Sequence, residues 1–397
     1  MKMLTPFFTV LSVALFAASL LSAQEYCALE KKLIEYGWDV PTPEYIRDNI
    51  REMEKRPFDG VVFRLKGGGK VLDITPMTEE HYAGDYAAVA EIAWDKFTDN
   101  FVIMWAATEQ DWFNDDHWAI IENNTALVAR AAKLAHCKGI CFDPEPYGKN
   151  PWNYLETEHK DSRSYLEYAG QARKRGAQFM RAIQREFPDP QILSLYQFAL
   201  FGEFCKPMEL EKLVEDLSRH SYALYPPFLN GMLDAAGEGT VLSDGNENAY
   251  YYDRTERYYE AYHLMKQGVR YLVDPKLWKV FDTKVLAGSS LYVDQYFGMR
   301  ADPVLGHKMT PDERSLWFEH NVYHALRSTD RYAWCYSEKM NWWTGETVPP
   351  GADEAIRRAR EKLSRGETLG FDLAPIVAAA KERPFPEAPK EEAPPAP

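Results

Sequence analysis

Strand-like and helix-like segments alternate along almost the whole chain, and this alternation constrains the fold more than any other feature. Short apolar segments typical of buried strands occur at 34–39, 59–65, 101–107, 139–145, 191–198, 240–247, 284–294 and 332–338. Apolar residues recur at helical spacing over 43–56, 119–136, 165–187, 208–219, 254–268 and 311–328. Strands in this number, most followed by a helix, predict an α/β fold, a closed (β/α)8 TIM barrel. An alternative adds 221–225 as a further strand within an elaborated connection over 220–239.

The two ends of the chain differ in composition from the predicted barrel. Residues 1–23 combine Lys2, an apolar run and the small-residue site Ser22-Ala23, which is the pattern of a secretory signal cleaved near Ala23. Residues 384–397 contain six prolines and mixed charges, and we expect them to form a disordered tail. The catalytic domain is therefore predicted to cover 24–383, as a single barrel with elaborated βα loops, in a secreted or periplasmic protein.

The charge balance limits the partners of the chain. There are 46 Lys and Arg against 60 Asp and Glu, a formal net charge of −14. This excess of acid argues against binding to nucleic acid or to anionic membrane surfaces. Beyond the signal, no stretch is long and apolar enough to insert into a membrane in the mature form. The sequence does not indicate the oligomeric state.

The segment from Lys138 to Gly148, KGICFDPEPYG, reads as a buried strand that ends in two carboxylates. Residues two apart on a strand share a face, so Asp143 and Glu145 point away from Ile140 and Phe142. An apolar outer face with acids at the C-terminal tip is how a (β/α)8 barrel builds an active site. The alternative is that these acids only cap the turn that follows.

Acids also stand at the C-terminal tips of other predicted strands, as Asp39, Asp244 with Glu247, Asp294, and Glu338. Asp294 is expected to face the barrel interior. Asp244 has a second interpretation, as a turn former in Ser-Asp-Gly-Asn. Glycoside hydrolysis needs two carboxyl groups, one protonated and one ionised, and acids that converge on one rim suit that chemistry. The predicted catalytic residues are Asp143, Glu145, Glu247, Asp294 and Glu338.

Aromatic residues crowd the same tips, and the chain has 11 tryptophans. Sugar rings present apolar C–H faces that stack on aromatic rings, while their hydroxyl groups bind nearby polar side chains. The predicted substrate-binding residues are Trp38, Asp39, Trp105, Tyr147, Tyr196, Asp244, Tyr292, Trp334 and Trp342. The predicted partner is a carbohydrate substrate, without a cofactor.

The stretch Gly139-Ile-Cys-Phe-Asp143-Pro-Glu145 resembles the strand-four motif D-G-x-D-x-D-x-E of chitinase-type (family eighteen) glycoside hydrolases. The resemblance implies that Glu145 is the general acid and that Asp143 positions an N-acetyl group of the substrate. The first two acidic positions of the motif are Lys138 and Cys141 here, and its Trp is Pro144. The resemblance covers about half of the motif, and it supports a barrel glycosidase more than that particular family.

Two other functions are compatible with the sequence. A metal-dependent hydrolase would use Glu319-His320-x-x-x-His324, which places two imidazoles on one helix face, although the segment lies within a helix rather than at a strand tip. A non-catalytic glycan-binding protein would keep the aromatic residues but would not need converging acids. The converging acids favour a secreted glycoside hydrolase that cleaves a poly- or oligosaccharide, with Glu145 as proton donor and its partner acid unassigned.

Overall fold

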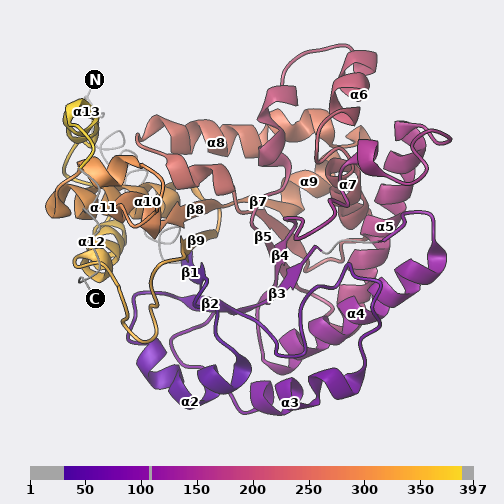
Figure 1. Cartoon of the computed structure of the whole chain (residues 1–397), viewed down its shortest axis with the longest axis horizontal. Coiled ribbons are helices and arrows are strands. Elements are labelled where there is room, and N and C mark those ends of the chain that lie inside the picture. Colours follow the sequence, from indigo (N-terminus) through magenta and orange to yellow (C-terminus); the bar gives the residue numbers. More distant parts are fainter. Residues whose placement is uncertain (1–30, 107–109, 387–397) are drawn as a thin grey trace, which may run out of the picture.

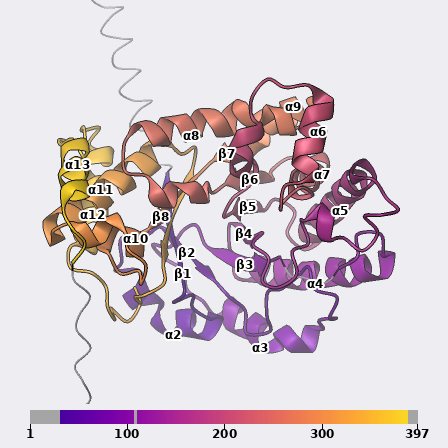
Figure 2. The same cartoon turned by 45° about the horizontal axis from the view of Figure 1, so that its top comes forward.

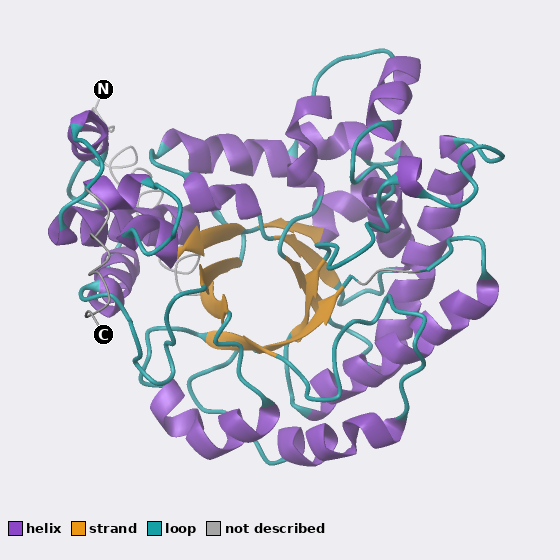
Figure 3. Cartoon of the chain, viewed as in Figure 1, coloured by secondary structure: helices purple, strands orange, loops and turns teal. Residues whose placement is uncertain are grey.

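The computed structural model describes residues 31–106 and 110–386, and it is an α/β barrel of parallel strands (Figure 1 and Figure 3). The strands are β1 Lys32–Gly37, β2 Gly60–Phe63, β3 Phe101–Trp105, β4 Gly139–Asp143, β5 Gln191–Ser194, β6 Val241–Asp244, β7 Val285–Ala287, β8 Ser289–Tyr292 and β9 Tyr332–Ser337. The predicted signal at 1–23 and positions 387–397 of the predicted tail lie outside the described residues. The predicted TIM-barrel class is confirmed.

The barrel is nearly closed, and the segment predicted as one strand over 284–294 supplies both of its edges. The sheet order is β7-β6-β5-β4-β3-β2-β1-β9-β8, and every pair is parallel. Consecutive strands β7 and β8 pair with β6 and β9 respectively, with only Gly288 between them. A Cβ at Gly288 would lie 2.6 Å from the carbonyl oxygen of Asp244, so the chain can turn here only because the residue is glycine.

Helices surround the barrel, with α2 and α3 along one side and α8 and α9 along the opposite side (Figure 1 and Figure 2). The α-helices are α2 Pro43–Met53, α3 Glu79–Ala90, α4 Asp115–Leu134, α5 Tyr165–Glu186, α6 Leu210–Ser218, α7 Tyr225–Ala235, α8 Glu256–Lys266, α9 Trp278–Lys284, α10 Val293–Phe297, α11 Pro311–Ser328, α12 Ala352–Ser364 and α13 Ala374–Glu382. Short 3₁₀ turns are Tyr154–Glu156, Phe198–Phe204, Glu247–Tyr251, Gly268–Leu272, Pro275–Leu277 and Leu305–Lys308.

The alternative of a further strand at 221–225 is wrong, because residues 221–224 form a turn that leads into helix α7. Helices α5 and α7 pack backbone to backbone through two glycines. A Cβ at Gly176 would lie 1.9 Å from the carbonyl oxygen of Phe228, and one at Gly231 would lie 1.9 Å from that of Arg173. The two glycines therefore allow α7 to pack closely and cover the barrel wall. The elaborated connection that the sequence predicts before β6 thus contains helix α7.

Local sequence signals explain where the long helices begin. Ser164 caps α5 and exchanges hydrogen bonds with Glu167 three positions later, and Thr310 and Glu313 do the same at α11, where Pro311 is the first helical residue. Both are capping boxes, which satisfy amide groups that a helix leaves unpaired at its start. No helix in the described part of the chain is both long and apolar enough to cross a membrane.

Aromatic side chains fill the barrel interior. Tyr36 of β1 packs against Trp334 and Tyr336 of β9, with ring centroids 6.0 and 5.7 Å apart. Phe142 of β4 points the other way and contacts Phe179 of α5 at 5.2 Å. This confirms the predicted outer face of β4, so Asp143, the next residue, points into the barrel.

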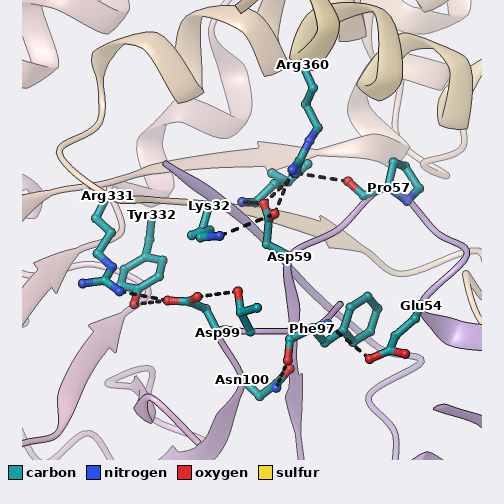
Figure 4. A network of polar contacts seen from close by, with 12 residues as sticks. Lys32, Glu54, Pro57, Asp59, Phe97, Asp99, Asn100, Arg331, Tyr332 and Arg360 are labelled. Carbon is teal, nitrogen blue, oxygen red and sulfur yellow. Dashed lines mark hydrogen bonds and ion pairs between the residues drawn. The ribbon is translucent and has the colours of Figure 1, made fainter. Parts of the chain in front are cut away.

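A polar network ties the amino-terminal end of the barrel together (Figure 4). Arg360 of α12 donates two hydrogen bonds to Asp59, at 2.6 and 2.8 Å, and the amide of Leu33 donates to the same carboxylate. Buried Asp99 accepts a hydrogen bond from the hydroxyl of Tyr332 at 2.7 Å. These contacts join β1 to α12 and β9 to the loop before β3, so this end of the barrel serves stability.

Candidate active site

The end of β4 carries a compact group of Asp143, Glu145 and Tyr147. Asp143 is fully buried, and its carboxylate accepts hydrogen bonds from the amide of Glu145 at 2.9 Å and from the hydroxyl of Tyr147 at 2.8 Å. The same hydroxyl lies 3.2 Å from Oε2 of Glu145. Glu145 is exposed, because the strand ends at Asp143 and the next two residues form a loop. Asp143 thus anchors the loop that presents Glu145 to solvent.

An open cleft of about 260 Å³ joins this group to the loops that follow β5 and β6. Glu145 lies on its wall together with Glu247, which begins the 3₁₀ turn after β6. Tyr196 and Tyr222 line the same cleft, and their hydroxyl groups are 2.9 Å apart. The structure therefore brings together two of the predicted catalytic carboxyl groups and surrounds them with tyrosines.

The surroundings of these carboxyl groups change their pKa values. Burial raises the pKa of Asp143 to about 7, although hydrogen bonds from Glu145 and Tyr147 oppose the rise. Burial also raises the pKa of Glu247 to about 8, and the negative charges of Asp143 and Glu145 add to the effect. Glu247 therefore holds a proton at neutral pH, a property required of a general acid.

Two of the acids predicted at strand tips, Asp244 and Asp294, accept hydrogen bonds from backbone amides. Asp244 accepts hydrogen bonds from the amides of Gln197, Ala199 and Asn246, at 2.8 to 3.1 Å. Asp244 is 1% exposed, so it cannot contact a substrate and the prediction that it binds sugar is wrong. It instead joins the loop after β5 to the turn that carries Glu247, so the turn interpretation of its sequence was the better one.

Asp294 has the same kind of role on the other side of the rim. It lies in α10 rather than at a strand tip, and it is fully buried. Its carboxylate accepts hydrogen bonds from the amides of Glu338 at 2.9 Å and Lys339 at 2.8 Å. Asp294 therefore positions the loop after β9, and its lack of exposed surface contradicts the prediction that it acts on the substrate.

Glu338 lies apart from the cleft, among aromatic residues of β8 and β9. Its Oε1 accepts a hydrogen bond from Tyr336 at 3.2 Å, and burial followed by a hydrogen bond to Glu338 raises the pKa of Tyr292. Trp38, at the end of β1, is 67% exposed, and Tyr147 is 45% exposed. Both rings are therefore available to a ligand.

Several predicted aromatic contacts are not at the surface. Trp334 and Trp342 are 0% exposed: Trp334 fills the barrel and donates to the carbonyl of Gly245 at 2.9 Å, and Trp342 packs edge-on against Phe58. The prediction that these two bind sugar is wrong, because neither ring has a free face. Trp105 is partly exposed at the end of β3.

A buried carboxyl group escaped the sequence analysis. Glu35 lies on the face of β1 opposite Tyr36, is 0% exposed, and has no hydrogen-bond donor for either oxygen among the described residues. Burial, followed by the negative charge of Asp39, raises its pKa well above the usual value. Asp39 accepts the amide of Trp342 at 2.7 Å, so it braces a loop. An acidic residue within an otherwise apolar strand was the signal in the sequence that could have identified Glu35.

The histidines of α11 are packing residues. His320 and His324 both contact the hydroxyl of Thr255, at 3.0 and 3.2 Å, between α8 and α11. Burial lowers the pKa of both, that of His324 to about 3. A separate group near the carboxyl end of the barrel, Asp111, Glu158 and His159, has ligand atoms within 4.8 Å of one another. That group could hold a cation, but it is partly exposed and is not among the residues that line the cleft.

Comparison with known proteins adds a likeness in fold. No family model matches the chain, and no curated protein matches its sequence. A mutant O-GlcNAc hydrolase from Thermobaculum terrenum is 10% identical with a TM-score of 0.42 over 88% of this chain, which spans only 62% of that one. ZgEngAGH5_4 is 11% identical (TM-score 0.41, 84% of this chain and 97% of that one).

An endocellulase from Pyrococcus horikoshii, in complex with cellotetraose, is 12% identical with a TM-score of 0.41 over 83% of this chain and 92% of that one. These structural neighbours are glycoside hydrolases by name. Their likeness to this chain concerns the fold and does not extend to individual site residues.

Proposed function

We propose that this protein is a glycoside hydrolase that uses Glu145 and Glu247 as its catalytic pair. The observation that carries the proposal is that both carboxyl groups line one open cleft, and that the pKa of Glu247 is raised to about 8. Glycosidases need one protonated and one ionised carboxyl group on either side of the scissile bond. Glu145 is exposed on the same cleft and lies beside the Tyr147 hydroxyl, and we assign it as the nucleophile or base.

In the proposed reaction, Glu247 donates its proton to the glycosidic oxygen as the bond from that oxygen to the anomeric carbon breaks. The leaving sugar departs as an alcohol. The carboxylate of Glu145 either attacks the anomeric carbon, which gives a glycosyl ester that water then hydrolyses while Glu247 takes the proton of that water, or it takes a proton from a water molecule that attacks the anomeric carbon directly. Proton magnetic resonance of the first-formed product distinguishes the two, because nucleophilic attack retains the anomeric configuration and direct attack by water inverts it.

Asp143 and Tyr147 are proposed to act through Glu145. Asp143 fixes the amide of Glu145, and the Tyr147 hydroxyl is within reach of both carboxylates. The strand-four resemblance offers a second assignment, in which Glu145 is the acid and buried Asp143 assists an N-acetyl group of the substrate. The two assignments differ in whether Glu247 is needed for proton donation.

Two isosteric variants test the proposal on a panel of polysaccharides and 4-nitrophenyl glycosides. Glu247→Gln is expected to lower kcat on unactivated glycans by about 10²–10⁴-fold and to spare the nitrophenyl substrates, whose leaving group needs no proton. Glu145→Gln is expected to lower turnover of both kinds. If only Glu145→Gln shows the leaving-group dependence, Glu145 is the acid and the second assignment holds. Binding without any cleavage would support the non-catalytic alternative.

The amino-terminal pattern supports a proposal of export. Residues 1–23 have the composition of a secretory signal, and the aromatic cleft suits an extracellular glycan. Expression of the full chain followed by cell fractionation and N-terminal sequencing is expected to give an exported protein that begins near Gln24. Recovery of the intact N-terminus in the cytoplasm would contradict this.

A further inference from the structure

Aromatic side chains lie between the cleft and the end of β1, with buried tyrosines at the centre and an exposed ring at either side. We call this group the aromatic strip, and it consists of Tyr251, Tyr250, Tyr292, Tyr336 and Trp38. Tyr250 stacks on Tyr336 with ring centroids 5.4 Å apart and an angle of 14°, and Tyr292 lies 4.9 Å from Tyr250 and 5.2 Å from Tyr336. The two ends are the exposed members, Tyr251 at 58% and Trp38 at 67%. Tyr250 and Tyr251 also line the cleft, so the strip extends directly from it.

A cation lies over the strip near each end. The guanidinium carbon of Arg300 is 5.4 Å from the centroid of Tyr292, and the ammonium of Lys339 is 5.1 Å from that of Trp38. Both residues follow the carboxyl ends of barrel strands, Arg300 after α10 and Lys339 after β9. Cations held over aromatic faces keep a fixed position without being neutralised.

Neither cation is paired with a buried acid. Arg300 contacts Asp302 at 3.4 Å, but the side chain of Asp302 is 81% exposed, and such pairs contribute little. Lys339 forms no ion pair with any residue that the structure describes. Glu338 is the other nearby acid, and its carboxylate accepts the Tyr336 hydroxyl. The two cations lie over the aromatic strip in a chain with a net charge of −14.

The combination of rings and cations fits one class of ligand. Aromatic rings offer their faces to the apolar side of a sugar ring, whereas Arg and Lys bind carboxylate or sulfate groups. A neutral glycan would gain from the rings but would leave the two positive charges without partners. Arg300 also contacts Tyr251, which holds its guanidinium in place, and both cationic side chains reach the surface where a ligand can meet them.

We propose that the aromatic strip is a binding subsite for an acidic sugar residue, so that the substrate is a glycan carrying carboxylate or sulfate groups. The inference rests on the proposed glycosidase cleft, which the strip extends. Arg300 and Lys339 would bind the anionic groups, while Trp38 and Tyr251 contact the sugar rings.

The test compares wild type with the double variant Arg300→Gln/Lys339→Gln. The probes are polygalacturonate, alginate and chondroitin sulfate, each beside its carboxyl-reduced or desulfated form, and the measurement is the dissociation constant by affinity electrophoresis. Wild type is expected to bind at least one acidic glycan more tightly than its neutral form, and the double variant to bind it about tenfold more weakly, with the neutral form changed less than twofold. Lys96→Gln, an exposed lysine in the loop before β3, is the matched control.

Each outcome separates this inference from the proposed function. Failure of every acidic probe to bind, or equal affinities in wild type and the double variant, would overturn the acidic subsite. If neutral glycans are then still hydrolysed, the glycosidase proposal stands alone. If acidic glycans bind through Arg300 and Lys339 but are not cleaved, the subsite stands and the catalytic proposal fails. Preference for sulfated over carboxylated probes, or the reverse, identifies the anionic group.

Discussion

The raised pKa of Glu247 predicts that removing this carboxyl group stabilises the protein in alkali. Below its ordinary pKa of 4.5, Glu247 is protonated in both the folded and the unfolded chain. Between 4.5 and about 8 the folded protein keeps a proton that the unfolded chain has lost. The free energy of unfolding therefore falls as pH rises through this window. In Glu247→Gln this contribution is absent, so the variant gains relative to wild type as pH rises.

The size of the gain follows from the size of the pKa change. A rise from 4.5 to about 8 sets an upper limit of roughly 5 kcal/mol at pH values above 8. Glu247 is partly exposed at the cleft, so water screens much of this penalty, and we expect about 2 kcal/mol. At pH 4.5 the glutamine and the protonated glutamate are close to isosteric, and the expected difference is near zero.

Urea unfolding at pH 5, 7 and 9 measures this difference. Glu247→Gln is expected to raise the midpoint progressively from pH 5 to pH 9. Glu238→Gln, an exposed carboxyl in the loop before β6, serves as the control and is expected to show no such trend. A difference between Glu247→Gln and wild type that is constant across pH, or that shrinks toward pH 9, would refute the argument that Glu247 is protonated in the folded protein at neutral pH.

Three further predictions test packing and positioning. Gly176→Ala is expected to destabilise the protein by about 3 kcal/mol or more in urea unfolding, because its Cβ would meet a backbone carbonyl of α7 at 1.9 Å. Gly170→Ala in the same helix has open space and is expected to stabilise by about 0.5–1 kcal/mol, and a loss there would contradict the packing argument. Asp294→Asn is expected to cost about 1–3 kcal/mol, measured in the same way, since one backbone amide loses its acceptor. Tyr147→Phe removes a hydrogen bond that lowers the pKa of Asp143, so carbon-13 titration is expected to place that pKa above 7, and an unchanged value would contradict the contact.

The arrangement of the barrel could be predicted because local patterns determine it. Apolar runs alternate with helical periods, and capping residues such as Ser164 and Thr310 mark where helices start. The face of β4 followed from residue alternation, which correctly directed Phe142 outward and Asp143 inward. The break at Gly288 could not be predicted, since it depends on the approach of the Asp244 carbonyl from a distant strand.

The aromatic residues show why surface contacts are harder to predict than strands. Trp38 and Trp334 both stand near strand tips in the sequence, but one is 67% exposed and the other 0%. The difference depends on strand alternation and on what covers each ring: Trp334 points into a barrel filled by Tyr250 and Tyr36. That packing involves residues from β1, from β9 and from the 3₁₀ turn after β6, and it leaves no local trace near Trp334.

The acids at the rim of the barrel fall into two groups that differ in what their oxygens bind. Asp244 and Asp294 have their oxygens filled by backbone amides, so they fix loops and have little capacity left for a substrate. The chain folds back so that Asp244 holds the turn of Glu247, and Asp294 holds the loop of Glu338. Glu247 is left on the cleft wall, where burial and two neighbouring carboxylates keep it protonated. An acid whose oxygens accept backbone amides has little capacity left for a ligand, whereas an acid that lines a cleft without such amides remains available to one. Strand-tip acids in a sequence therefore indicate where to look for a site, and the amides that reach them show which acids are already used by the fold.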